Sequence, residues 1–319
     1  IDDGAAFAWY VKSAEGGNVQ AQSNVGAAYA MGNGVKQDHE AAVRWFERAA
    51  KNGDAHGQFN LAVLLSSGTG VAKDLAKAAK WFELAGTTTN YTVANGESRW
   101  QINDRFGIPL ELIREANPKV DFNRIKGGEN IVIPGARIAQ FNLGMLYEQG
   151  KGVKKDHKRA ADWHLLAAKA GLADAQFALG YLLEKGKANG TVLDTPDFVG
   201  AVHWYSRAAN QGFGPAQQNL GQLHMKGQGT TRDLTLAYKW FALAGRNAKE
   251  YQMSPSTKAR FKKELSDEEW KAKEARDEQL KETQKNMEAA TEKMAGAMPT
   301  ADLSRAKQLV ETFVAKREK

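Results

Sequence analysis

The residues of this chain that could do chemistry are few, and their spacing does not make an active site. The 319-residue sequence has no cysteine, which excludes disulfides, thiolate metal sites and cysteine nucleophiles. Its six histidines form no H-E-x-x-H or other metal-ligand spacing. No serine, histidine and aspartate set and no carboxylate pair stands out above chance. We therefore predict a protein that is not an enzyme and that uses neither a metal nor a cofactor.

Glycine pairs of the form G-x-G recur along the chain, and such pairs can cradle phosphate groups. No β-type segment precedes them and no G-K-S/T follows, so the pattern does not indicate a phosphate-binding loop. The pairs are Gly32/Gly34, Gly68/Gly70, Gly150/Gly152 and Gly227/Gly229. Because glycine adopts positive φ without steric cost, these pairs predict turns between helices.

A ladder of tryptophans sets the period of the chain. Trp9, Trp45 and Trp81 lie 36 residues apart, as do Trp204 and Trp240. An apolar helix-type segment precedes each G-x-G pair, and an aspartate follows the pair and begins the alanine-rich segment that holds the tryptophan. The pattern predicts pairs of antiparallel helices, with the aspartate capping the second helix and the tryptophans buried in the core between repeats.

These residues resemble the Sel-one-like repeat, a branch of the tetratricopeptide superfamily, over about residues 5–86 and 139–245. The resemblance implies an all-α, right-handed superhelical solenoid whose concave surface binds a protein partner, and it implies no enzyme. The spacing from Trp163 to Trp204 is 41 residues, which predicts a loop extension at 187–196. The sequence does not identify the protein partner.

A second break in the period is much larger. Trp81 and Trp163 are 82 residues apart, 46 more than one period, so we predict an inserted module. Within it, β-type segments at 91–93 and 131–133 bracket two short helical segments, in a β-α-α-β order. Ser98 and Gln101 form a capping box for the first helix, and Pro109 stands at N1 of the second. The predicted organisation is repeats over 1–86, the insert over 87–135, repeats over 136–250 and a helical tail over 251–319.

The insert resembles a LysM domain in Tyr91-Thr92-Val93, Gly96-Glu97-Ser98, Trp100, Ile102, Asn117-Pro118, Gly127-Gly128-Glu129 and Ile131-Val132-Ile133-Pro134. The resemblance implies binding of polymers that contain N-acetylglucosamine, peptidoglycan first and chitin second, in a groove between two loops. The residues that it assigns to this groove are Gly96, Glu97, Ser98, Arg99, Asn117, Pro118, Val120, Asp121 and Ile125. Arg99 stands where the family usually has an apolar residue. It could either bind an anionic glycan or disrupt the binding pocket. Ser98 and Asn117 are expected to contribute to binding more than to stability.

The net charge and the lack of long apolar stretches limit the classes of partner that the chain is expected to bind. The net charge of +7 is spread over mixed acidic and basic segments, which favours solvated helix faces over a nucleic-acid site. No apolar stretch is long enough to span a membrane. Together the two resemblances predict a non-enzymatic adaptor of the periplasm or cell envelope, whose targeting signal is not in this sequence. The alternative is a pure protein-interaction scaffold whose insert is inert or engineered.

The tail beyond residue 250 has its own pattern. Residues 266–292 are rich in Lys and Glu, and their apolar residues are too sparse for a heptad seam, so a solvated helix is predicted. After Pro299, an apolar face runs from Leu303 to Phe313. We expect this last helix to cap the repeats or to dock on a partner.

Overall fold

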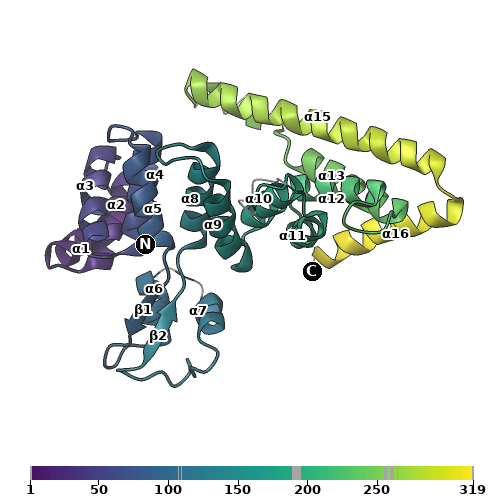
Figure 1. Cartoon of the computed structure of the whole chain (residues 1–319). Coiled ribbons are helices and arrows are strands. Elements are labelled where there is room, and N and C mark those ends of the chain that lie inside the picture. The colour runs from purple at the N-terminus through teal and green to yellow at the C-terminus, as the bar shows by residue number, and fades with distance from the viewer. Residues whose placement is uncertain are drawn as a thin grey trace. The chain divides into compact units, whose positions relative to one another are not determined.

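The computed structural model describes residues 2–106, 108, 110–188, 195–254, 257–258, 262–263 and 265–317 (Figure 1). The chain divides into two compact units, Ile1–Leu172 and Ala173–Lys319. As predicted, helical hairpins make up most of both units, and a small β-α-α-β module interrupts the first. Most of the expected loop extension at 187–196, and Pro109, lie outside the described residues. Among the described helices, none combines the length and the apolar character that a membrane span requires.

In the first unit the repeats contribute seven helices to the described part of the chain: α1 (Asp3–Glu15), α2 (Val19–Met31), α3 (His39–Lys51), α4 (Ala55–Ser67), α5 (Leu75–Gly86), α8 (Arg137–Gln149) and α9 (His157–Lys169). In the second unit the described helices are α10 (Ala173–Glu184), α11 (Phe198–Asn210), α12 (Gly214–Lys226), α13 (Leu234–Glu250), α15 (Asp267–Ala297) and α16 (Thr300–Arg317).

The turns between paired helices form as the sequence predicts. The Asp38 carboxylate caps α3 by accepting a hydrogen bond from the Ala41 N–H at 2.9 Å, and the first glycine of the pair, Gly32, ends α2 with φ of 78°. The second glycine of a pair meets the preceding repeat. A Cβ on Gly70 would lie 2.5 Å from the backbone carbonyl carbon of His39, at the start of α3. Glycine there lets successive repeats stack in direct backbone contact.

The predicted burial of the ladder tryptophans is wrong for most of them. Trp9 is 70% exposed, and only Trp240 is fully buried. After Trp9, the buried ring belongs to the residue that follows each ladder tryptophan: Phe46, Phe82, His164, Tyr205 and Phe241. In four of these five repeats the ring lies against a glycine of the first helix, so that a Cβ on Gly221 would be 2.8 Å from the Phe241 ring. Trp45, Trp81, Trp163 and Trp204 are half buried, and Trp45 packs against Ala14 of the preceding repeat.

Buried glutamines join successive repeats by hydrogen bonds that the sequence analysis missed. Gln22 Nε2 donates to the Ala14 carbonyl at 3.3 Å, and Gln217 Nε2 donates to the Ala209 carbonyl at 3.1 Å. Both acceptors lie near the end of the preceding repeat's second helix. Each such bond satisfies a helix-end carbonyl and a buried amide at once.

The inserted module does not interrupt the stacking of the repeats around it. The chain leaves the repeats after α5 and returns at α8 (Figure 1), and the Ala136 N–H donates to the Ala85 carbonyl at 2.9 Å. Gln140 Nε2 donates to the Gly86 carbonyl at 2.9 Å. The two ends of the insert are therefore adjacent, which lets the solenoid accept it as one long surface loop.

The module itself consists of β1 (Thr89–Thr92), α6 (Arg99–Phe106), α7 (Leu110–Ala116) and β2 (Asn130–Ile133). The strands pair antiparallel, with Thr89 opposite Ile133. Ile102 of α6, Ile113 of α7 and Ile131 of β2 form the centre of a separate apolar core. This core holds the two helices against the sheet and thereby fixes the loops that follow β1 and α7.

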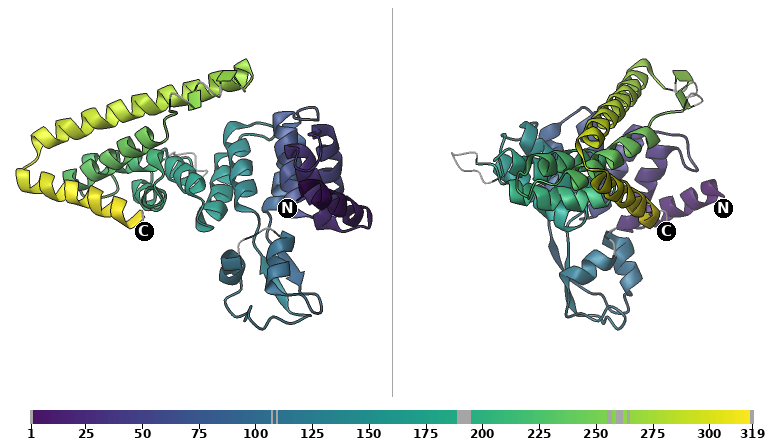
Figure 2. Two further views of the ribbon diagram at one scale, coloured as in Figure 1. Left: turned by 180° about the vertical axis from the view of Figure 1, so that it is seen from behind. Right: turned by 90° about the vertical axis from the view of Figure 1, so that its right-hand side faces the viewer.

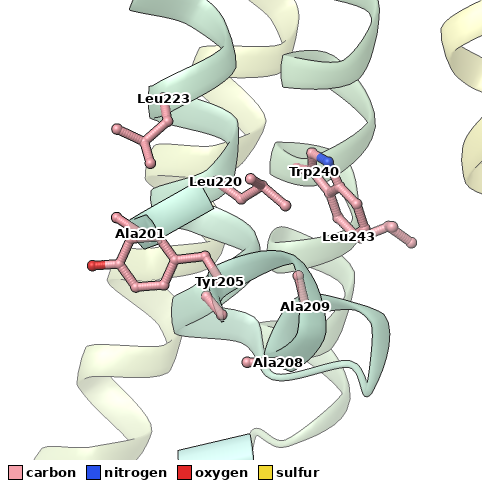
Figure 3. Packing of buried hydrophobic residues seen from close by; sticks show 9 residues of the cluster. Ala201, Tyr205, Ala208, Ala209, Leu220, Leu223, Trp240 and Leu243 are labelled. Carbon is pink, nitrogen blue, oxygen red and sulfur yellow. The ribbon is translucent and has the colours of Figure 1, made fainter. Parts of the chain in front are cut away.

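The tail packs on the last repeat rather than lying free in solvent. The predicted Lys/Glu-rich helix is α15, which begins at a Ser266/Glu269 capping box but buries Met287 and Met294 with Phe241 of α13. After α15 the chain turns back into α16 (Figure 2), whose Phe313 ring lies 5.8 Å from that of Trp240. Trp240 also belongs to the apolar cluster of this unit (Figure 3). The predicted capping of the repeats by the last helix is confirmed.

Candidate functional site

The loop that follows β1 is held by a buried carboxylate. Glu97 is almost fully buried, and its Oε2 accepts hydrogen bonds from the Tyr91 hydroxyl at 2.6 Å and from the Ala94 N–H at 3.0 Å. Gly96 supplies the positive φ of 76° that the turn needs. The Glu97 side chain is therefore used by the fold, while Ala94, Asn95 and Gly96 of this loop are exposed.

Ser98 caps α6, and Arg99 is the first residue of this helix. The Ser98 N–H donates to Gln101 Oε1 at 2.8 Å, and the Gln101 N–H donates back to Ser98 Oγ at 3.3 Å. This is the capping box that the sequence predicts. Trp100, one residue into the helix, is 62% exposed.

The loop that follows α7 is held by an asparagine. Asn117 Nδ2 donates to the carbonyls of Ile113 and Val132, each at 2.7 Å, and Asn117 Oδ1 accepts from the Val132 N–H at 2.7 Å. Asn117 is buried, so these bonds tie the end of α7 to β2 without competition from water. The side chain of Asn117 has a structural role that the sequence analysis did not foresee.

The remaining predicted residues of this loop divide into two groups. Val120 and Ile125 are half buried and pack against the core of the module. Pro118 and Asp121 are exposed, and Asp121 Oδ1 accepts from the Asn123 N–H at 3.0 Å in a local Asx turn. Asp121 therefore shapes the loop and sets the position of Asn123.

Arg99 connects the two loops. Its Nη1 donates to Asn123 Oδ1, and Arg114 Nη2 approaches the same oxygen at 3.5 Å. The Arg99 guanidinium also lies over the Trp100 ring, 5.0 Å from its centroid. Sequence reasoning missed Asn123, although the Asp121-x-Asn123 spacing was a possible signal of the turn that presents it.

The structure connects the two loops through Arg99 and Asn123, and it gives the residues predicted for the groove different tasks. Glu97 and Asn117 are buried and stabilise the loops, Val120 and Ile125 pack half buried against the core of the module, and Arg99 bridges from one loop to the other. Within the described residues of the chain, no cluster of His, Asp or Glu could hold a metal ion. The arrangement is a pair of surface loops that buried side chains hold in place and that Arg99 connects.

Comparison with protein families assigns both parts of the chain. Six segments match the Sel1 repeat: residues 2–18, 19–54, 55–87, 137–172, 173–213 and 214–248. They cover more than half of the sequence. The chain belongs to the Sel1 repeat family. Residues 91–134 match the LysM domain.

Solved structures of Sel1 proteins resemble this one. A Sel1 repeat protein from Oxalobacter formigenes is 25% identical and has a TM-score of 0.53, over 72% of this chain and 74% of its own. The protein c5321 of uropathogenic Escherichia coli strains, a protective antigen with an SLR fold, is 20% identical over 99% of this chain and 80% of its own, with a TM-score of 0.37. The comparison with curated proteins gave no match. The two matched families are binding modules, and no enzymatic family is indicated.

Proposed function

We propose that this Sel1 repeat protein is an adaptor of the cell envelope. Its LysM module binds a glycan that contains N-acetylglucosamine, peptidoglycan in preference to chitin, and its repeats bind a protein partner. The LysM match over residues 91–134 supports the glycan class, and the six repeat matches support the protein partner. Joining the two in one chain concentrates the protein partner at the glycan surface, which lets a weak sugar site act effectively.

The observation that carries the proposal is the preorganisation of the two loops. Buried hydrogen bonds of Glu97 and Asn117 fix the loop backbones before any ligand arrives. Binding then requires little further ordering, so the backbone N–H and C=O groups can pair with an acetamide at low entropic cost. The half-buried Val120 and Ile125 offer an apolar wall for the acetamide methyl group.

The positive charge of Arg99 favours peptidoglycan over chitin as the ligand. Peptidoglycan carries carboxylates on its peptide stems, whereas chitin is neutral. The Arg99 guanidinium donates to the neutral amide oxygen of Asn123. A ligand carboxylate could replace this oxygen as the acceptor and would form a stronger, charge-assisted hydrogen bond. Three more cations, Lys119, Arg124 and Lys126, lie exposed on the second loop, which holds two carboxylates, Asp121 and Glu129. The groove therefore favours an anionic glycan.

A substitution of Arg99 by the residue type usual in the family tests this role. We expect Arg99→Leu to lower the affinity for soluble peptidoglycan fragments about tenfold at low salt and to reduce its salt dependence. Affinity for chitin oligomers should stay equal or rise. Calorimetric titrations with both ligands at two ionic strengths measure these effects.

The matched control is Arg114→Leu, because Arg114 approaches the same Asn123 oxygen from α7. This control should change neither affinity by more than about twofold. An unchanged affinity of Arg99→Leu for peptidoglycan would exclude the charge role. Equal losses for both ligands would show that Arg99 contributes packing through its aliphatic stem.

A further inference from the structure

Trp100 is an aromatic residue that the LysM module does not use in its apolar core. It is 62% exposed, and it does not belong to the cluster that holds α6 and α7 against the sheet. Ladder tryptophans differ, because Trp45 packs against the preceding repeat and Trp240 is covered by α16. An indole also has a lower helix propensity than Ala, Lys or Glu, so it adds nothing to the stability of α6. The ring is therefore open to a contact outside the chain.

The Trp100 ring lies beside the contact that joins the two loops of the module. Arg99, the preceding residue, places its guanidinium 5.0 Å from the centroid of the ring. The same guanidinium donates to Asn123 Oδ1 on the second loop. Because one guanidinium contacts both groups, the indole adjoins the loops between which the proposed function places the glycan.

The contact with Arg99 also orders the indole. A cation over the ring is attracted by its π electrons, and the acceptor of Arg99, Asn123, is itself held by Asp121 in the local turn. The ring is thus positioned before a ligand arrives, which lowers the entropic cost of binding. Most of the Trp100 surface is exposed even with Arg99 over it, so a flat apolar surface stays available.

A polymer of N-acetylglucosamine fits such a surface. Each pyranose ring presents a flat face of C–H groups, with hydroxyl and acetamide groups at its edge. Aromatic side chains supply large apolar area to ligand sites, while a few polar groups fix the orientation of the ligand. An acetamide bound by the loops leaves the next sugar of the same chain beside them, where it meets the indole.

We propose that Trp100 forms a second sugar subsite, which stacks on the C–H face of the pyranose ring next to the sugar whose acetamide the loops bind. This inference rests on the proposed function and extends it by one sugar. Ring stacking does not depend on ligand charge. Trp100 therefore contributes equally to neutral and anionic glycans, whereas the charge of Arg99 acts on the anionic ones.

The test uses the intact chain, with soluble peptidoglycan fragments and chitin oligomers titrated by calorimetry at two ionic strengths. Trp100→Ala should weaken binding of both ligands about tenfold, by the same factor at low and high salt. Trp100→Tyr keeps a flat ring and should retain most of the affinity. Trp9→Ala is the matched control and should change neither affinity. Trp9 is 70% exposed and has Lys12 Nζ at 5.6 Å from its ring centroid, but it lies in the repeats.

Fluorine NMR observes the same contact without altering the surface. In a chain labelled with fluorotryptophan, the Trp100 resonance is identified by its loss in Trp100→Tyr. We expect this resonance to shift as either ligand is added, while the Trp9 resonance stays in place. Circular dichroism should give the same melting temperature for Trp100→Ala and the unchanged chain, because the core of the module lacks this residue.

The outcomes separate stacking from an indirect effect on Arg99. A loss of affinity confined to peptidoglycan at low salt would mean that Trp100 only positions the guanidinium, and it would overturn the subsite. Equal affinities of Trp100→Ala and the unchanged chain, beside a stationary Trp100 resonance, would overturn it as well. In both cases the unchanged chain still binds glycan, so the proposed function stands. Failure of the unchanged chain to bind either ligand would contradict the proposed function and this inference together.

Discussion

At the scale of single residues, the structure separates side chains that support the groove from those that can meet a ligand. The sequence predicts that the groove residues Glu97 and Asn117 lie together, because the LysM-like motif contains both. It does not predict that their polar groups are directed inward. Asn117 bonds with Val132, 15 residues further on, and no local pattern encodes such a contact. Pro118 is exposed and Arg99 bridges the two loops, so the proposed function assigns recognition to these two residues.

The role of Asn117 leads to a prediction about stability. Asn117→Ala removes three hydrogen bonds, one buried and two partly buried, in which the Val132 N–H and two carbonyls now take part. We expect the LysM module to lose about 2–4 kcal/mol of unfolding free energy. Urea unfolding followed by the fluorescence of Trp100, in a chain whose other tryptophans are replaced by Phe, measures this loss. The control Pro118→Ala should cost less than about 0.5 kcal/mol, and an equally stable Asn117→Ala chain would contradict the structural role.

At the scale of elements, the helices, caps and turns follow from the sequence because they depend on local patterns. Asp38 and Gly32 lie where capping and positive φ require them. The packing within a repeat could not be predicted in the same way. Trp45 and Phe46 recur with the same period, and only the position of Gly26 opposite Phe46 shows which of the two rings is buried. Periodicity finds the repeat but does not distinguish neighbours within it.

Gly70, the second glycine of its turn, and Gly53, in the turn between α3 and α4, allow a matched pair of substitutions. Gly70 and Gly53 both have positive φ, at 68° and 84°, so replacement by alanine strains both to a similar degree. A Cβ on Gly70 meets the backbone of His39 at 2.5 Å, whereas a Cβ on Gly53 meets nothing within 4 Å. We expect Gly53→Ala to cost about 1 kcal/mol and Gly70→Ala at least about 2 kcal/mol more. Thermal unfolding of both variants measures the difference, and equal costs would mean that repeats do not stack through this turn.

The glutamine contacts differ in the repeat of Trp163. Seven residues after the tryptophan, Asn52, Gln211 and Asn247 donate to the buried glutamines Gln22, Gln176 and Gln217. Ala170 holds this position in the repeat of Trp163, and the buried Gln140 Oε1 has no hydrogen-bond partner among the described residues.

We expect Ala170→Asn to restore the missing donor and to raise the unfolding free energy by about 1 kcal/mol. Ala170→Leu, of similar volume but without an amide, is the control and should not stabilise the chain. Chemical denaturation compares the three chains. A loss of stability in Ala170→Asn would show that the position does not reach Gln140.

At the scale of the whole molecule, the chain joins repeats and an inserted module whose apolar cores share no residue. The Ala136–Ala85 and Gln140–Gly86 hydrogen bonds close the repeats beneath the insert. A chain in which a single glycine replaces residues 87–135 should therefore keep its folded repeats. The order of modules could be predicted from the spacing of Trp81 and Trp163. The adjacency of the insert's ends is seen only in three dimensions.

Retention on insoluble peptidoglycan tests the central claim most directly. The full chain, the chain without residues 87–135 and an unrelated LysM protein as positive control are sedimented with purified sacculi, and the bound fraction of each is measured. Our account predicts that the full chain and the control sediment with the sacculi while the deleted chain, still helical by circular dichroism, stays in solution. Equal retention of the full and deleted chains, or no retention of the full chain beside a retained control, would contradict the assignment of glycan binding to the LysM module.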